Sequence, residues 1–217
     1  MSGMRPDPDL GVLRERLAVG LERLGLTADA QQRDRLIAFL KLLGRWNQAY
    51  SLTAVRDPGE MVPRHLLDSL SVSAYLFGET ILDVGTGAGL PGLPLAVMAP
   101  QRVFHLLDSN GKKTRFVRQA VIELGLNNVT VIQARMESYL PTRKFATIIS
   151  RAVASLPELV RATGRLLDRP ARLLVMKGRE PEIALHNLEP YPDAVRVHRL
   201  QVPFLDGERH LIEIHYD

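Results

Sequence analysis

The chain has 217 residues, of which 46% are hydrophobic, 24% charged and 6% aromatic. This is the composition of an ordinary globular protein, and it excludes a disordered chain or a fibre. Cysteine is absent, which excludes disulfides, thiolate metal sites and cysteine nucleophiles. The formal net charge is +4 and its excess lies after residue 79, a modest imbalance that is compatible with a nucleic-acid partner.

The sequence also bears on location. The longest uncharged stretch, Val84 to Gln101, contains four glycines and three prolines, so it cannot form the roughly 20-residue apolar helix that spans a bilayer. The first eight residues lack the apolar run of a secretory signal. We therefore expect no membrane partner, a cytoplasmic location and a monomeric chain.

The first third of the chain has helical patterns. Leucines recur every three or four residues from Leu10 to Leu24, and a similar pattern runs from Leu36 to Tyr50. A third helix is expected after Asp57, the predicted N-cap, with Glu60 reaching back to complete a capping box. We expect residues 1–79 to form a helical extension that docks RNA or covers one face of a sheet.

From Thr80 the pattern changes to short apolar runs that alternate with helical segments. The runs are Ile81–Val84, Val103–Leu107, Val129–Ile132, Thr147–Ile149 and Leu173–Met176. Such alternation predicts a parallel sheet with crossover helices. Two final segments, 195–202 and 210–216, are joined by a loop containing Asp206-Gly207, which predicts an antiparallel hairpin. We expect residues 80–217 to form an α/β domain.

A glycine-rich loop follows the first predicted strand. That strand ends at Asp83, the loop holds Gly85, Gly87 and Gly89, and the second strand ends at Asp108. A doubly wound sheet binds its ligand at this edge. Glycines allow a tight turn and a close backbone approach, and an acid after the second strand can accept hydrogen bonds from both hydroxyls of a ribose. The sequence therefore predicts a ligand with an adenosine-like ribose.

Two cofactors meet this description. Residues 87–92 match the dinucleotide pattern G-x-G-x-x-G, which alone is a weak signal for NAD. A carboxylate at Asp83 would repel a pyrophosphate, whereas it would favour the sulfonium and ammonium groups of S-adenosylmethionine. The residues favour S-adenosylmethionine over NAD, with a glycine-rich turn that binds no ligand as the third interpretation.

Several spaced motifs together resemble one family. They are Asp83 to Gly92, Leu107-Asp108-Ser109, Ile149-Ser150-Arg151-Ala152, Met176-Lys177-Gly178 and Gly207 to Leu211. The chain resembles the glucose-inhibited division protein B family, bacterial small-subunit ribosomal RNA methyltransferases that make 7-methylguanosine. The resemblance covers nearly the whole chain. It implies a class I S-adenosylmethionine-dependent methyltransferase fold with a Rossmann-like seven-stranded sheet, and the small ribosomal subunit, through its 16S rRNA, as partner.

The resemblance also implies particular cofactor contacts. Together with the loop residues above, the expected cofactor-binding set is Asp83, Gly85, Gly87, Gly89, Leu90, Asp108, Met136, Glu137 and Arg151. Met136 would act through its backbone, and it stands where the family ordinarily has alanine. Glu137 is expected to meet the adenine edge.

Five basic residues follow predicted strands at the cofactor edge. Each alone is more often a solvated charge, but together they resemble a phosphate-binding ring, and they match basic positions of the family: Lys112, Arg135, Arg151, Lys177 and Arg209. We expect Arg151 and Arg209, with Lys177, in the catalytic pocket. RNA contacts are expected from Lys112, Arg135, Lys177 and Arg209.

The chemistry leaves alternatives open. Guanine N7 carries a neutral lone pair, so its methylation needs positioning and no dedicated base. Ribose methylation would use a lysine base, for which Lys177 is the candidate. Further alternatives are methylation of another RNA base, a non-catalytic ribosome-assembly factor that binds a nucleotide-like ligand, and a small-molecule methyltransferase.

The histidines and aromatic residues have more ordinary interpretations. No metal is expected, because the spacing of His65, His105 and His210 matches no ligand pattern. His65 and Asp68 are three residues apart and predict a local pair, with a contact to the cofactor or catalytic pocket as the second interpretation. Trp46 and Tyr50 are assigned to packing.

Overall fold

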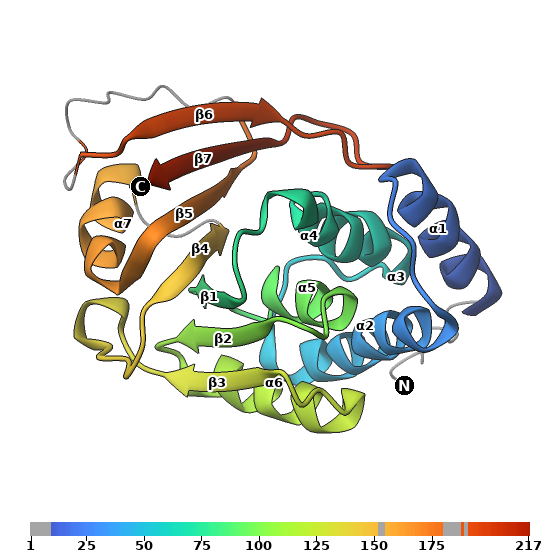
Figure 1. The fold of residues 1–217 in the computed structure, drawn as a ribbon. Helices are drawn as coiled ribbons and strands as arrows, with labels where there is room; N and C mark the ends of the chain where they lie inside the picture. The colour runs from blue at the N-terminus through green and yellow to red at the C-terminus, as the bar shows by residue number, and fades with distance from the viewer. Residues whose placement is uncertain (1–9, 152–154, 180–187, 189–190) are drawn as a thin grey trace.

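The computed structural model describes residues 10–151, 155–179, 188 and 191–217. Its centre is a seven-stranded sheet in the order β3-β2-β1-β4-β5-β7-β6 (Figure 1). The strands are β1 Thr80–Val84, β2 Val103–Asp108, β3 Val129–Gln133, β4 Phe145–Arg151, β5 Leu167–Lys177, β6 Ala194–Arg199 and β7 His210–Tyr216. The first five pair in parallel, and β7 lies antiparallel between β5 and β6. The predicted parallel sheet and terminal hairpin are thus confirmed.

Helices cover both faces of this sheet. The chain before β1 contributes α1 Leu10–Arg23, α2 Ala30–Tyr50, α3 Pro58–Met61, the π-helical turn η1 Val62–Leu67, α4 Asp68–Leu70 and the 3-10 turn η2 Ser73–Tyr75. Further along follow α5 Gly92–Met98, α6 Gly111–Leu124, η3 Met136–Ser138, α7 Leu156–Thr163 and η4 Gly164–Leu166. Alternate strand residues face opposite sides, so Ile81 joins one hydrophobic cluster and Leu82 the other.

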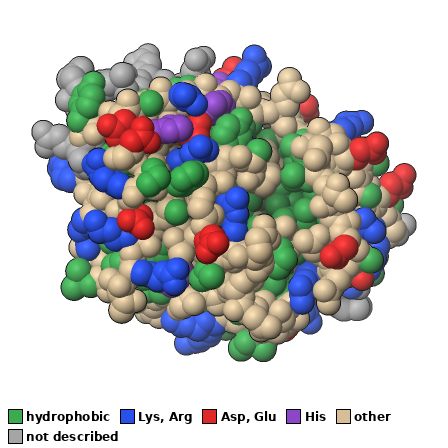
Figure 2. Space-filling model, viewed as in Figure 1, with side chains coloured by type: hydrophobic (Ala, Val, Ile, Leu, Met, Phe, Trp, Pro, Cys, Tyr) green, Lys and Arg blue, Asp and Glu red, His purple; other side chains and the backbone are tan. Residues whose placement is uncertain are grey.

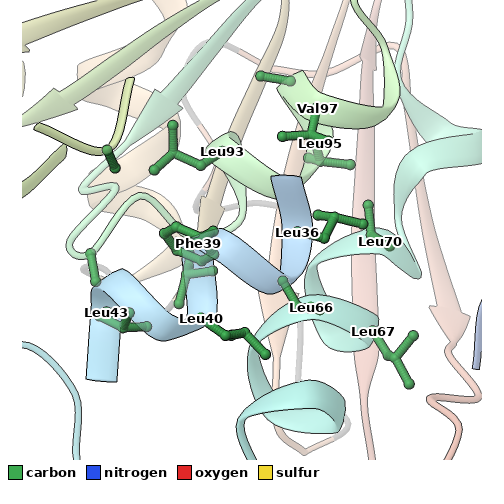
Figure 3. Close-up of a cluster of buried hydrophobic side chains, with 14 of the residues drawn as sticks. Leu36, Phe39, Leu40, Leu43, Leu66, Leu67, Leu70, Leu93, Leu95 and Val97 are labelled. Carbon is green, nitrogen blue, oxygen red and sulfur yellow. The ribbon is translucent and has the colours of Figure 1, made fainter. Parts of the chain in front are cut away.

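The larger cluster joins the N-terminal helices to the sheet. Leu36 and Phe39 of α2 and Leu66 of η1 share it with Leu93 of α5 (Figure 3). The smaller cluster lies under α7. The division at residues 79 and 80 stays a prediction, but the helices before it cover one face of the sheet through a shared core.

Local capping explains where α2 begins. The apolar pattern starts at Leu36, but the helix begins earlier, at Ala30. The Asp29 carboxylate accepts a hydrogen bond from Gln32 N at 2.7 Å, and the Gln32 side chain accepts one from Asp29 N at 2.9 Å. This capping box satisfies backbone donors in an exposed turn, where hydrophobic periodicity gives no signal.

The third predicted helix begins as expected but does not continue as a regular α-helix. Asp57 caps it by accepting from Gly59 N at 2.9 Å. Glu60 does not complete the predicted capping box, and its carboxylate lies 3.1 Å from Arg64 Nε instead. The π-helical turn η1 then interrupts the helix. Because a π turn is wider than an α turn, it changes the faces on which later side chains lie.

None of the described helices combines the length and the apolar character needed to cross a bilayer.

Candidate active site

The carboxyl ends of β1, β2 and β4 border a cavity of about 450 Å³. It is walled by the glycine loop, the ends of β2 and β4, the turn η3 and the loop after α2. Of the expected cofactor residues, the lining includes Gly85, Gly87, Leu90, Asp108, Met136, Glu137 and Arg151. It also includes Thr53 and Lys113, which the sequence analysis did not select. The N-terminal region therefore contributes directly to the cavity.

The backbone of the glycine loop is tied to β2. Gly85 N and Thr86 N both donate to the Leu107 carbonyl, at 2.8 and 3.0 Å. Gly87 has φ +59°, and among the residues that the structure describes a Cβ built on it would have only the Gly85 carbonyl within 4 Å, at 3.9 Å. A side chain at residue 87 would therefore project into the cavity. At Gly89, by contrast, an added Cβ would collide with Leu93, so this glycine serves packing behind the lining.

Asp83 lies behind the loop instead of facing the cavity. Its carboxylate is fully buried and accepts hydrogen bonds from Thr86 Oγ1 at 2.7 Å and Gly92 N at 2.8 Å. Burial raises the pKa of this carboxyl to about 6, although these two hydrogen bonds lower it. The sequence suggested that Asp83 contacts a cationic ligand directly. The structure does not support this contact, because the Asp83 side chain binds the glycine loop and the start of α5 instead.

Asp108 does face the cavity. Its Oδ2 accepts from Gly87 N at 2.9 Å and its Oδ1 accepts from Asn110 N at 2.8 Å. These bonds hold the carboxylate rigidly, yet each oxygen keeps a second lone pair. The carboxylate can thus accept hydrogen bonds from the hydroxyls of a ribose, as expected.

The turn η3 is held by a residue that the sequence analysis missed. Arg165, in η4, donates from Nη2 to the carbonyls of Met136 at 3.0 Å and Glu137 at 2.9 Å. The Met136 carbonyl also accepts from Tyr139 N at 3.4 Å, so a backbone contact from Met136 to a ligand would use the Met136 N–H group. Arg165 is nearly thirty residues away in sequence, and no local motif marks its role.

The five predicted basic residues follow the same edge of the sheet as a row. Arg135 follows β3, Lys112 lies in the first turn of α6 after β2, Arg151 ends β4, and Lys177 ends β5. Lys177 pairs with His210, the first residue of β7, and Arg209 directly precedes His210. Arg209 therefore lies close to Lys177. Arg135 and Arg151 line the cavity, whereas Lys112, Lys177 and Arg209 do not. On the face shown in Figure 2, basic side chains are interspersed with acidic ones and form no continuous patch.

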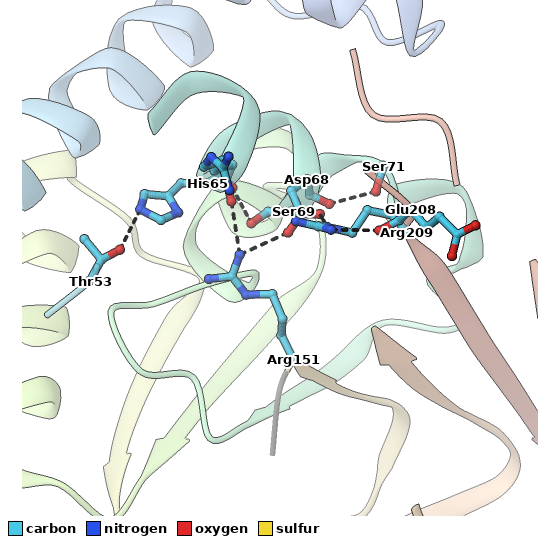
Figure 4. Close-up of polar contacts among 9 residues, drawn as sticks. Thr53, His65, Asp68, Ser69, Ser71, Arg151, Glu208 and Arg209 are labelled. Carbon is cyan, nitrogen blue, oxygen red and sulfur yellow. Dashed lines mark hydrogen bonds and ion pairs between the residues drawn. The ribbon is translucent and has the colours of Figure 1, made fainter. Parts of the chain in front are cut away.

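Two of these cations share one buried carboxylate. Asp68, only 3% exposed, lies with Oδ2 3.1 Å from Arg151 Nη1 and with Oδ1 2.9 Å from Arg209 Nε (Figure 4). The predicted local pair of His65 and Asp68 is wrong, because the π turn directs the two side chains to different partners. His65 Nε2 lies 3.0 Å from Thr53 Oγ1 instead. Burial, aided by the charge of Arg151, lowers the pKa of His65 to about 4.

The other singled-out residues lie apart from the cavity. His105 is in β2 and His210 begins β7, and among the described residues no group of His, Asp or Glu could hold a metal ion. Trp46 packs edge-on against Phe116 at a centroid distance of 5.6 Å, as its assignment to the core predicts. The ring of Tyr50 packs against that of Trp46 at a centroid distance of 5.2 Å, but Tyr50 is 42% exposed. Its assignment to packing is therefore only partly correct.

The sheet order and the site together define the class of protein. An antiparallel β7 between β5 and β6, with a glycine loop after β1 and an acid at the end of β2, is the class I S-adenosylmethionine-dependent methyltransferase fold. The magnesium protoporphyrin IX methyltransferase of Synechocystis PCC 6803, solved with bound SAM, superposes with a TM-score of 0.60 at 18% identity, covering 88% of this chain and 99% of that chain. TrmN from Thermus thermophilus gives 0.55 at 20% identity, covering 71% of this chain and 49% of that chain.

Sequence comparison gives the particular family. The chain belongs to the GidB family, described as rRNA small subunit methyltransferase G, whose family model matches residues 32–212. The ribosomal RNA small subunit methyltransferase G of Methylococcus capsulatus is 53% identical over 195 residues, 90% of this chain and 95% of that protein. Its namesake from Alkalilimnicola ehrlichii is 49% identical over 209 residues, 96% of this chain and 93% of that protein. The resemblance drawn from the motifs is thereby confirmed.

Proposed function

We propose that this protein transfers the methyl group of S-adenosylmethionine to N7 of one guanine in the 16S rRNA of the small ribosomal subunit. The observation that carries the proposal is the cavity at the carboxyl edge of the sheet, with Gly87, Asp108 and Arg151 in its lining, in a chain of an rRNA methyltransferase family.

The residues of the cavity suit this cofactor. Asp108 would accept hydrogen bonds from the ribose hydroxyls, and Glu137 with the Met136 N–H would meet the adenine. Gly87 leaves room for the ligand to approach the backbone. When bound, S-adenosylmethionine supplies a methyl group on a positively charged sulfur.

The acceptor nitrogen sets the demands on the protein. N7 attacks with its own lone pair, so no proton has to be removed and the chain's task is to hold the base in line. Arg151 borders the cavity and keeps guanidinium donors that can bind the guanine carbonyl oxygen, as arginines do in DNA grooves, or an adjacent phosphate. Lys112, Arg135, Lys177 and Arg209 would contact the RNA backbone along the same edge.

The test is methyl transfer from labelled S-adenosylmethionine to small ribosomal subunits from cells that lack this protein. Mass spectrometry of the nucleosides should find the label in 7-methylguanosine at one site. Label in ribose or in another base would overturn the proposed chemistry. Binding to subunits without transfer would instead indicate an assembly factor, and turnover that persists unchanged in an Arg151→Ala variant would indicate a small-molecule substrate.

The proposal extends to location and assembly. We propose that the enzyme acts as a monomer. Because ribosomal subunits are its substrate, we place it in the cytoplasm.

A further inference from the structure

The pairing of Asp68 with two arginines leads to a role for this buried acid. We propose that Asp68 is a positioning residue for methyl transfer, which holds the guanidinium group of Arg151 at the cavity and that of Arg209 next to it, and offsets their charge while the guanine becomes cationic. The proposal rests on the proposed N7 methylation.

The geometry brings three distant segments together. Asp68 comes from the helix that follows η1, Arg151 ends β4, and Arg209 precedes β7 (Figure 4). Arg151 is 83 residues from Asp68 in sequence and Arg209 is 141 residues from it. Arg209 itself does not line the cavity, but through one carboxylate it is joined to Arg151, which does. Hydrogen bonds between charged groups are short and strong, so a buried carboxylate can define the place of both cations.

The anchoring bonds leave part of each guanidinium available. Arg151 uses Nη1 for both Asp68 and the Arg64 carbonyl, which lies at 3.3 Å. Arg209 uses Nε for Asp68 and Nη1 for the Glu208 carbonyl, at 2.8 Å. Within the described part of the chain, Nη2 of both arginines and Nε of Arg151 have no partner. These donors can bind an oxygen of the substrate without breaking the contacts to Asp68.

The charge balance explains why an acid belongs here. In the reaction the bond from sulfur to the methyl carbon breaks, the N7 lone pair forms the new bond, and the positive charge moves from sulfur to the ring. Two arginines alone would place two positive charges beside that ring and oppose the transfer. Together with Asp68, the two arginines carry one net positive charge. They can then donate hydrogen bonds to the substrate with less electrostatic repulsion of the cationic ring than two unpaired arginines would cause.

The test compares two buried carboxylates. Asp68→Asn keeps the shape of the side chain but removes its charge. Glu213→Gln is the matched control, because Glu213 is equally buried and lies 3.0 Å from Arg172 Nη1 and 2.8 Å from His198 Nε2, away from the cavity lining. For each variant we would measure thermal unfolding, S-adenosylmethionine binding by calorimetry, and kcat and KM on undermethylated small subunits.

The expected result is a separation of these quantities. Asp68→Asn should lower kcat about 100-fold, the loss typical of a reacting group misplaced by about 1 Å, and leave cofactor affinity within about threefold of the wild type. Glu213→Gln should lower thermal stability but leave kcat unchanged. Adding Arg209→Ala to Asp68→Asn should cost little more than the larger single effect, because the two residues act as one unit.

Other outcomes would overturn the role. A wild-type kcat for Asp68→Asn refutes it. A loss of activity that follows loss of cofactor binding and stability would assign Asp68 to folding alone. Losses that multiply in the double variant would show that Asp68 and Arg209 act independently, which also contradicts the proposal. If the wild-type chain itself transfers no methyl group to N7, the proposed function fails first.

Discussion

Gly87 offers a way to separate the cost of a backbone conformation from the loss of a ligand site. In Gly87→Ala, the new methyl group would meet no atom of the described part of the chain closer than 3.9 Å, so no clash with these residues is expected. The backbone at φ +59° is nevertheless unfavourable for alanine, by about 1–2 kcal/mol. For a chain of this size, each kcal/mol lowers the melting temperature by about 2–4 °C.

Gly25 provides the matched control. It has φ +69°, no atom of the described residues lies within 4 Å of a Cβ built on it, and it follows α1 away from the cavity. Gly25→Ala and Gly87→Ala should therefore lower the melting temperature to a similar extent. Only Gly87→Ala should weaken S-adenosylmethionine binding, by about 10- to 100-fold, because overpacking by one methyl group costs about 1–3 kcal/mol.

Differential scanning fluorimetry and titration calorimetry of the two variants test this reasoning. Unchanged cofactor affinity in Gly87→Ala would show that the ligand does not approach this part of the loop. A loss of stability much larger than that of Gly25→Ala would show that the loop cannot hold alanine even without ligand.

Three further predictions concern residues around the cavity. Asp83 has a folded-state pKa of about 6, above its unfolded value of 3.8, so its contribution to stability is complete below pH 4 and is lost as the pH rises through 6. In urea titrations, the unfolding free energy of Asp83→Asn relative to that of the wild type should therefore increase by about 3 kcal/mol between pH 4 and pH 8. A difference that does not change with pH would contradict this prediction. His65 should titrate near pH 4 by NMR, so that its contribution to stability is present above pH 6.5 and is lost as the pH falls through 4; a midpoint near 6.5 would show that its ring is hydrated. Arg165→Ala should weaken cofactor binding about threefold, the effect of losing a typical hydrogen bond, while Arg161→Ala on α7 should leave calorimetric affinity unchanged.

The helices, strands and loops that depend on local rules can be predicted from the amino-acid pattern alone. Alternating apolar runs placed the strands, and the order of glycines after Asp83 placed the ligand loop at the carboxyl edge. The same reasoning placed Arg151, Lys177 and Arg209 at that edge, because each adjoins the end or start of a strand. Residues at strand ends are brought together by sheet topology, which the alternation of strands and helices already implies.

The contacts of those side chains, in contrast, depend on how the elements pack together. Asp83 looked like a ligand contact from its position beside the loop, but packing of α5 buried it against Thr86 and Gly92. The spacing of His65 and Asp68 suggested that they pair, but the helix there contains a π turn. In the folded chain Asp68 instead contacts Arg151 at the end of β4 and Arg209 just before β7. Periodicity defines which residues lie on an element, whereas the direction of a buried charge is set by partners that can be more than a hundred residues away.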